Sequence, residues 1–247
     1  MEQTHNSQTG FATVHEAKLY YETAGQGDSI LLLHAGVADS RMWDAQFEAF
    51  AQRYQIIRYD LRGFGRSLMP SGTFAHHEDV AGVLDFVGVD KTHVLGASFG
   101  GAVALDFTLA YPERVSGLVL CAPNVSGYEP STEELIGFWT AEEVALERGD
   151  IEAATELNVR LWVDGPQRQP EQVDAAVREQ VRDMQRQAFM IPVPEGVEEQ
   201  ELLPPAIELL AEIHVPTLII VGEQDVPEFI ELADIVAQGI NGAEKVM

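Results

Sequence analysis

The chain contains 247 residues, of which 46% are hydrophobic, and it carries a formal net charge of −25. This length and hydrophobic content predict one compact domain with an insertion. The acidic balance argues against nucleic acid and anionic membranes as partners, because like charges repel. No apolar run approaches the ~18 residues of a membrane span, and residues 1–10 lack the features of a signal peptide, so we expect a cytoplasmic protein. The single cysteine, Cys121, excludes an internal disulfide and fits a reducing compartment.

Short apolar stretches alternate with helical patterns through the first half of the chain. Strands are predicted at residues 11–15, 18–23, 29–33, 55–59, 92–95 and 115–121. Helices are predicted from about residue 41, at 75–87 and at 99–111. This alternation indicates an α/β fold with a mostly parallel central sheet and helices on both faces.

The alternation is interrupted by a long helical segment. Ser131 with Glu134 predicts a capping box at its first helix, and Pro170 predicts the start of its last helix. We therefore expect a core formed by residues 1–123 and 206–247, with a helical insertion formed by residues 124–205.

The alternation resumes in the last part of the chain. Residues 217–221 predict a strand, a helix follows Pro227, and a final strand begins near Ala243. The chain stops inside that strand, so we expect the C-terminal strand and the helix after it to be truncated.

The most informative motif is Gly96-Ala97-Ser98-Phe99-Gly100, which lies between an apolar strand and an apolar helix. This G-x-S-x-G pattern is typical of a nucleophile elbow, a strained turn that exposes the serine oxygen. Glycines flank the serine because the sharp turn leaves no room for side chains. The alternative is an ordinary strand-to-helix turn that happens to contain Ser98.

Other noteworthy residues also follow predicted strands. They are His34-Ala35-Gly36, Asp60 and Asp225. Because the carboxyl ends of parallel strands meet at one edge of a sheet, we expect these residues to lie on the same rim as Ser98.

Together these motifs resemble the α/β-hydrolase fold family, in particular members with a serine nucleophile and a helical cap. The matching stretches are Leu33-His34-Ala35-Gly36, residues 60–67, the Ser98 elbow and Gly222-Glu223-Gln224-Asp225. The first three look similar to the corresponding stretches of 3-oxoadipate enol-lactonase-like and esterase-like hydrolases. The resemblance implies that the helical insertion is a cap over the site.

The resemblance also implies a role for each site residue. Ser98 would be the nucleophile, and Asp225 would orient a catalytic histidine, with Glu223 as a rival acid. The backbone N–H groups of Phe99 and Gly36 would form the oxyanion hole.

Four side chains could line a substrate pocket between cap and sheet: His34, Phe99, Trp139 and Trp162. Phe99 has the strongest argument, because it directly follows the nucleophile. For His34 we favour a structural ring that braces its loop, and the tryptophans could equally be core residues. Residues 60–67 are expected to be structural, with Arg62 paired to a nearby carboxylate or carbonyl.

The histidine that such a triad needs is missing from the expected place, since no histidine follows His214. The family pattern places it after the final strand, a few residues beyond Met247. Of the histidines present, His76 and His77 are the best remaining substitutes. Without the last helix of the fold, part of the sheet edge or of one face should be exposed.

The sequence therefore predicts a serine hydrolase of the esterase or lactonase kind, acting on a small ester, lactone or related carbonyl compound through an acyl-enzyme at Ser98. The alternative is a non-catalytic ligand-binding protein on the same fold. We see no metal cluster or phosphate loop and predict no cofactor. The partner would be a small molecule, and the protein a monomer or homodimer; the substrate and the type of bond cleaved stay open.

Overall fold

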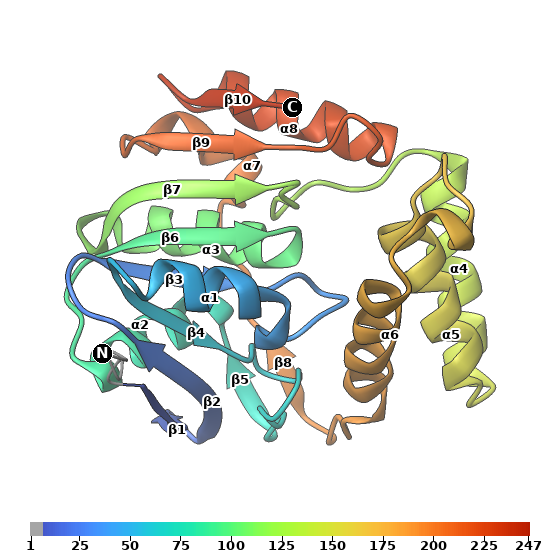
Figure 1. Ribbon diagram of the computed structural model, residues 1–247, viewed down its shortest axis with the longest axis horizontal. Helices are drawn as coiled ribbons and strands as arrows, with labels where there is room; N and C mark the ends of the chain where they lie inside the picture. Colours follow the sequence, from blue (N-terminus) through green and yellow to red (C-terminus); the bar gives the residue numbers. More distant parts are fainter. Residues whose placement is uncertain (1–6) are drawn as a thin grey trace.

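The computed structural model describes residues 7–247, which form one eight-stranded sheet in the order β1-β2-β4-β3-β6-β7-β9-β10. β2 pairs antiparallel with both β1 and β4, and every later pair of neighbours is parallel. The predicted α/β fold with a mostly parallel sheet is confirmed (Figure 1). The strands are β1 (Gln8–Val14), β2 (Ala17–Ala24), β3 (Ser29–Leu33), β4 (Gln55–Tyr59), β6 (Thr92–Ala97), β7 (Val115–Cys121), β9 (Thr217–Ile220) and β10 (Glu244–Val246).

Alternate side chains of the strands point to opposite faces of this sheet. Leu31 and Leu118 are buried on the face covered by α2, α3 and α8. Leu32 and Ile56 are buried on the opposite face, beneath α1. Burial on both faces explains why these strands are continuous apolar runs in the sequence. The helices are α1 (Asp44–Phe50), preceded by a 3₁₀ turn (Ser40–Trp43), α2 (His76–Val87), α3 (Phe99–Ala110) and α8 (Pro227–Gly239).

Between β7 and β9 the chain forms a group of helices beyond the carboxyl ends of the parallel strands. In Figure 1 the arrowheads of β6, β7 and β9 point toward the side of the molecule where these helices lie. The group contains α4 (Glu133–Glu147), α5 (Ile151–Asn158), a π-helical segment (Val159–Asp164) and α6 (Ala175–Met190). After these helices the chain returns to the core, where β8 (Val197–Glu199) pairs with β5 (Gly72–Phe74) in a small parallel sheet. The next helix, α7 (Ala206–Leu209), packs on α3.

The predicted capping box at the start of α4 was wrong. Thr132 is the N-cap, and its Oγ1 accepts a hydrogen bond from the N–H of Leu135 at 3.4 Å. Ser131 instead donates its N–H to the carboxylate of Glu228 at 2.7 Å. Glu228 comes from α8, 97 residues away in sequence, so a local pattern could not reveal it.

The predicted start of the last cap helix at Pro170 was also wrong. Pro170 opens a separate 3₁₀ turn that ends at Gln172. α6 begins at Ala175, where the side chain of Asp174 accepts the N–H groups of the first turn. The helix start is thus fixed by the N-cap residue Asp174, four positions after the proline.

One face of the sheet is partly open near β9 and β10. Ile220 and Val246 are register partners on these two strands, and their exposed fractions are 40% and 51%. The expected exposure at this edge is confirmed.

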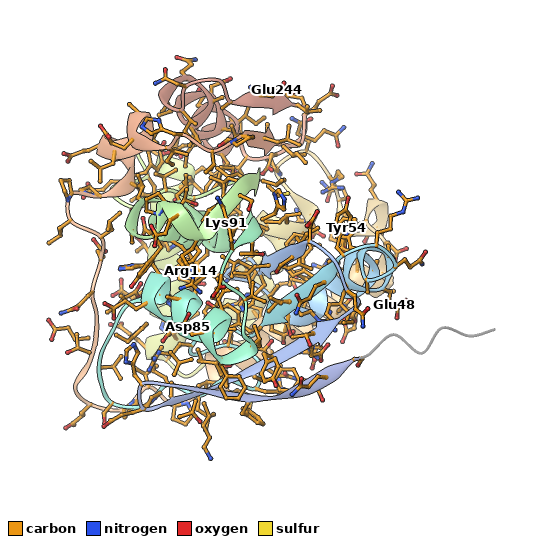
Figure 2. All side chains as sticks on the ribbon, turned by 90° about the vertical axis from the view of Figure 1, so that its left-hand side faces the viewer. Glu48, Tyr54, Asp85, Lys91, Arg114 and Glu244 are labelled. Atoms are coloured by element: carbon orange, nitrogen blue, oxygen red, sulfur yellow. The ribbon has the colours of Figure 1, made fainter. Side chains whose placement is uncertain are left out.

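The amino ends of the strands form the opposite side of the molecule from the helical group. Figure 2 views that side, where the labelled residues Tyr54, Lys91 and Arg114 lie close to the starts of β4, β6 and β7. Among the described helices, none combines the length and the apolar character needed to cross a membrane.

Candidate active site

Ser98 lies at the junction between β6 and α3, in a conformation that L-residues rarely adopt. Its φ of 48° and ψ of −114° place it in a strained region of backbone space. A Cβ atom at Gly96 would come 2.2 Å from the backbone oxygen of Gly100. A Cβ atom at Gly100 would come 2.5 Å from the backbone oxygens of both Leu33 and His34. Only glycine fits at these positions, which is the steric requirement of a nucleophile elbow.

Backbone hydrogen bonds hold the strained turn in place. The N–H of Ser98 donates to the oxygen of Cys121 at 3.0 Å. The carbonyl oxygen of Ser98 accepts from Gly101 at 2.8 Å and from Asn124 at 3.0 Å. The serine is therefore fixed between two parallel strands and the first turn of a helix.

Two backbone N–H groups near Ser98 are available to an oxyanion. Phe99 is the first residue of α3, and the first N–H groups of a helix have no partner within it. Among residues 7–247, neither the N–H of Phe99 nor that of Gly36 donates a hydrogen bond. The two loops approach closely, because a Cβ atom at Gly36 would lie 3.4 Å from the Cβ of Phe99.

A cavity of about 490 Å³ opens beside the elbow and brings most of the predicted site residues together. Its walls include Gly36, Ser98, Phe99, Trp139, Trp162 and Asp225. The loops that follow the parallel strands supply the floor, and the helices α4, α5 and α6 supply the facing wall. The volume is in the range typical of small-molecule sites.

Asp225 reaches this cavity from the loop after β9. The N–H of Val226 donates to its Oδ1 at 2.8 Å, which orients the carboxylate. Burial raises the pKa of Asp225, against the lowering effect of its own backbone hydrogen bond and of nearby Arg168. The rival acid, Glu223, lines a neighbouring cavity of about 410 Å³ and does not line the one at Ser98.

His34 is fully buried and does not line the cavity. The geometry therefore favours the structural ring over the pocket side chain. Its Nε2 accepts the N–H of Leu61 at 2.9 Å, so its Nδ1 donates to the oxygen of Ala35 at 2.8 Å. Burial lowers the pKa of His34, which keeps the ring neutral. The ring joins the loop after β3 to the loop after β4.

His76 also approaches the elbow without reaching the cavity. Its ring packs edge-on against Phe99, with centroids 5.1 Å apart, and against Phe74 at the same separation. Burial, followed by the charge of Arg62, lowers the pKa of His76 to about 3. Neither His76 nor any other described histidine lines the cavity.

Residues 60–67 form a structural loop beside the site. Asp60 accepts the N–H of Ser40 at 2.9 Å and that of Arg66 at 2.8 Å. Arg62 makes a buried bidentate ion pair with Asp79, in which Nε lies 2.8 Å from Oδ2 and Nη2 lies 2.6 Å from Oδ1. The predicted carboxylate partner of Arg62 is therefore Asp79.

Sequence reasoning missed three polar residues of the cap that line the same cavity, Glu142, Asn158 and Gln185. Each lies on a different helix of the insertion, α4, α5 or α6, among both polar and apolar neighbours in the sequence. The only available signal was a polar position on the inward side of a helix, which becomes visible once the packing is known.

Comparison with known proteins agrees with the fold. Residues 28–246 match the family model described as the alpha/beta hydrolase fold. The chain belongs to this family.

Its similarity to individual members is moderate. It is 41% identical over 108 residues to a protein from Azorhizobium caulinodans named "Putative carbamate hydrolase RutD", covering 42% of this chain and 41% of that protein. It is 32% identical over 130 residues to a 2-hydroxy-6-oxo-6-phenylhexa-2,4-dienoate hydrolase from Burkholderia cepacia, covering 47% and 46%. The chain thus spans less than half the length of these relatives. A crystal structure of a hydrolase from Pseudomonas aeruginosa PA01 superposes with a TM-score of 0.74 at 26% identity, covering 98% of this chain and 89% of that one.

Proposed function

We propose that this protein is a serine hydrolase of small esters, lactones or related carbonyl compounds. The observation that carries the proposal is Ser98, held at a φ of 48° in the wall of a 490 Å³ cavity that also contains Asp225. The named relatives are hydrolases, which supports the same reaction class. We further propose that residues 124–205 act as the cap that shapes the substrate side of this cavity.

In the proposed reaction the Ser98 oxygen attacks the substrate carbonyl, and its proton passes to a base. The tetrahedral oxyanion is bound by the N–H groups of Phe99 and Gly36, and each such donor is worth about 3 kcal/mol. Collapse of the intermediate breaks the bond to the leaving group, which takes up the proton and departs as an alcohol. Water then attacks the acyl-Ser98 ester and releases the carboxylic acid.

The base in this proposal is a histidine oriented by Asp225. β10 runs parallel to β9, with Val246 beside Ile220, so both strands end on the same edge of the sheet. A histidine a few residues after β10 would therefore approach the loop that carries Asp225. Placed there, its charged form would be stabilised by the Asp225 carboxylate.

The remaining expectations stay proposals of the same kind. We propose that the protein acts in the cytoplasm, on a small molecule, as a monomer or homodimer. The net charge of −25 disfavours nucleic acid as a partner.

The test is hydrolysis of p-nitrophenyl acetate and butyrate by this chain, by the Ser98→Ala variant, and by a chain extended beyond Met247 with a histidine-containing C-terminal segment. Turnover in either wild-type form that disappears in Ser98→Ala supports the proposal. A fluorophosphonate probe provides a second readout, because it adds mass to an activated serine. Turnover that survives Ser98→Ala, or no labelling and no turnover in both wild-type forms, would overturn it.

A non-catalytic ligand-binding protein is the second candidate. It is favoured by the contacts of His34 and His76. Both rings are buried in structural contacts, so neither is placed to act as the base for Ser98. Saturable ligand binding by the extended chain, without serine-dependent turnover, would select this candidate.

A further inference from the structure

The cap presents a fixed carboxylate to the cavity at Ser98. Asn158, which is 4% exposed, donates its Nδ2 hydrogens to the Oε1 of Glu142 and to the oxygen of Ala154. Asn158 therefore holds Glu142 against the cavity wall. The second oxygen of Glu142, Oε2, has no hydrogen-bond partner among residues 7–247.

Gln185 lies in the same wall, with its side-chain oxygen buried. Gln185 is 4% exposed and lines the cavity, and its Oε1 has no hydrogen-bond partner within residues 7–247. Polar atoms in such surroundings are normally hydrogen-bonded, because an unsatisfied one costs about 1–3 kcal/mol. Gln185 therefore adds a buried, unsatisfied polar group to the cavity wall and no positive charge.

Aromatic rings line the same cavity. Trp162 lies with its ring centroid 6.3 Å from that of Trp139 and 5.1 Å from that of Phe229. Phe138 packs edge-on between the two tryptophans, at 5.6 and 5.7 Å. Aromatic faces carry negative potential and attract cations that lie within about 6 Å of the ring centre.

The charged groups of this cavity are all acidic. Glu142 and Asp225 line it, and no lysine, arginine or histidine of the described residues does so. A second cavity of about 680 Å³ shares Trp139 and Glu142 with the first and adds Glu143 and Glu147.

The three arginines of α6 pair with other carboxylates, and Arg168, which lies near Asp225, donates to the backbone oxygens of Asp164 and Val163. Arg178 and Arg182 pair with Glu156, and Arg186 pairs with Glu152. They do not neutralise Glu142.

We propose that this wall binds an organic ammonium group, and that the substrates of the site are esters whose distal arm carries such a cation. Glu142 supplies the counter-charge, and Trp139 with Trp162 supplies aromatic faces. The substrate part of this statement rests on the hydrolase function proposed above, whereas the ammonium site rests on the cap residues alone. A carboxylate in the same place would meet Glu142 and Asp225 and be repelled.

The experiment is calorimetric titration of the 247-residue Ser98→Ala chain with two ligands of nearly the same shape. Acetylcholine carries the cation, and 3,3-dimethylbutyl acetate has carbon in place of the nitrogen. Monomethyl glutarate serves as the anionic ligand. We expect acetylcholine to bind about tenfold more tightly than the neutral ester, the size of a partly desolvated cation–π contact, and the anion to bind more weakly than both.

Two variants assign the preference to the wall. Glu142→Gln and Trp139→Leu should each reduce the acetylcholine advantage severalfold. Glu134→Gln removes a carboxylate from the exposed side of the same helix and should preserve the advantage. Equal or weaker binding of acetylcholine, or an advantage that survives Glu142→Gln, would overturn the proposal.

Binding in Ser98→Ala needs no catalysis, so this result is independent of the hydrolase test. An acetylcholine preference without turnover in any form would leave the ammonium site standing and remove the hydrolase function. Serine-dependent turnover of p-nitrophenyl esters without an acetylcholine preference would support the hydrolase function and overturn the ammonium site.

Discussion

The Cα of Gly100 lies so close to the backbone of His34 that an added Cβ would stand 2.5 Å from the His34 oxygen. This contact joins the first turn of α3 to the loop that carries Gly36. The position of the proposed oxyanion donors therefore depends on a residue without a side chain.

Gly100→Ala should both destabilise the fold and abolish serine-dependent activity. The methyl group would force α3 away from the loop after β3, at a cost of about 1–3 kcal/mol for overpacking. Urea unfolding measures the stability, and labelling by a fluorophosphonate measures the reactivity of Ser98.

The matched control is Gly137→Ala on α4, where an added Cβ meets no atom within 4 Å. This substitution should be neutral or stabilising by up to about 1 kcal/mol, because alanine favours the helix. Equal effects of the two substitutions would contradict the steric argument.

The buried pair of Arg62 and Asp79 should be costly to break. Asp79→Asn leaves the Arg62 guanidinium without a counter-ion in a site where its side chain is 4% exposed, so we expect a loss of about 3–5 kcal/mol in unfolding free energy. Replacing both residues, as in Arg62→Met with Asp79→Leu, should recover much of that loss. Chemical denaturation of these two variants tests this, and a loss in the double variant as large as that in Asp79→Asn would argue against coupling.

Acidification should destabilise the protein through His76. Burial, with the charge of Arg62, lowers the pKa of His76 in the folded state from 6.5 to about 3, so the unfolded chain takes up the proton first. The stabilising contribution is complete above pH 6.5 and is lost progressively as the pH falls toward 3. The slope from this one group approaches about 1.4 kcal/mol per pH unit.

His76→Asn should flatten the dependence of unfolding free energy on pH between about pH 6 and pH 4. His214→Asn, at an exposed position, is the control and should preserve the slope. A variant slope equal to that of the wild type would show that His76 takes up its proton in the folded state.

Glu228 should stabilise the segment that leads into α4, because it accepts hydrogen bonds from Tyr128, Ser131 and Thr132. Burial alone would raise the pKa of this carboxyl, but hydrogen bonds from Thr132, Ser131 and Tyr128 lower it to about 2. Glu228→Gln exchanges an acceptor oxygen for a donor that faces other donors, and we expect it to cost about 2 kcal/mol. Limited proteolysis at the start of α4 and thermal unfolding should both report the change, and unchanged values in both would refute the role.

The alternation of strands and helices, the elbow and the gathering of loops at one edge of the sheet could be anticipated from the sequence, because each depends on local pattern and on the geometry of parallel sheets. The structural role of His34 could also be anticipated, but its hydrogen-bond partner Leu61 and the role of Glu228 could not. His34 bonds to Leu61, and Glu228 to Ser131, across long sequence separations. The inward polar residues Glu142 and Gln185 resemble any solvated helix position until the cap is folded over the cavity.

In the 247-residue chain, the exposed side chains of Ile220 and Val246 have a consequence for behaviour at high concentration. Exposed apolar strand surface tends to associate, while a net charge of −25 keeps copies of the chain apart. Added salt shortens the range of that repulsion to about 3 Å at 1 M. Light scattering should then rise with ionic strength, so the protein is best kept, and its assembly state best measured, in dilute buffer.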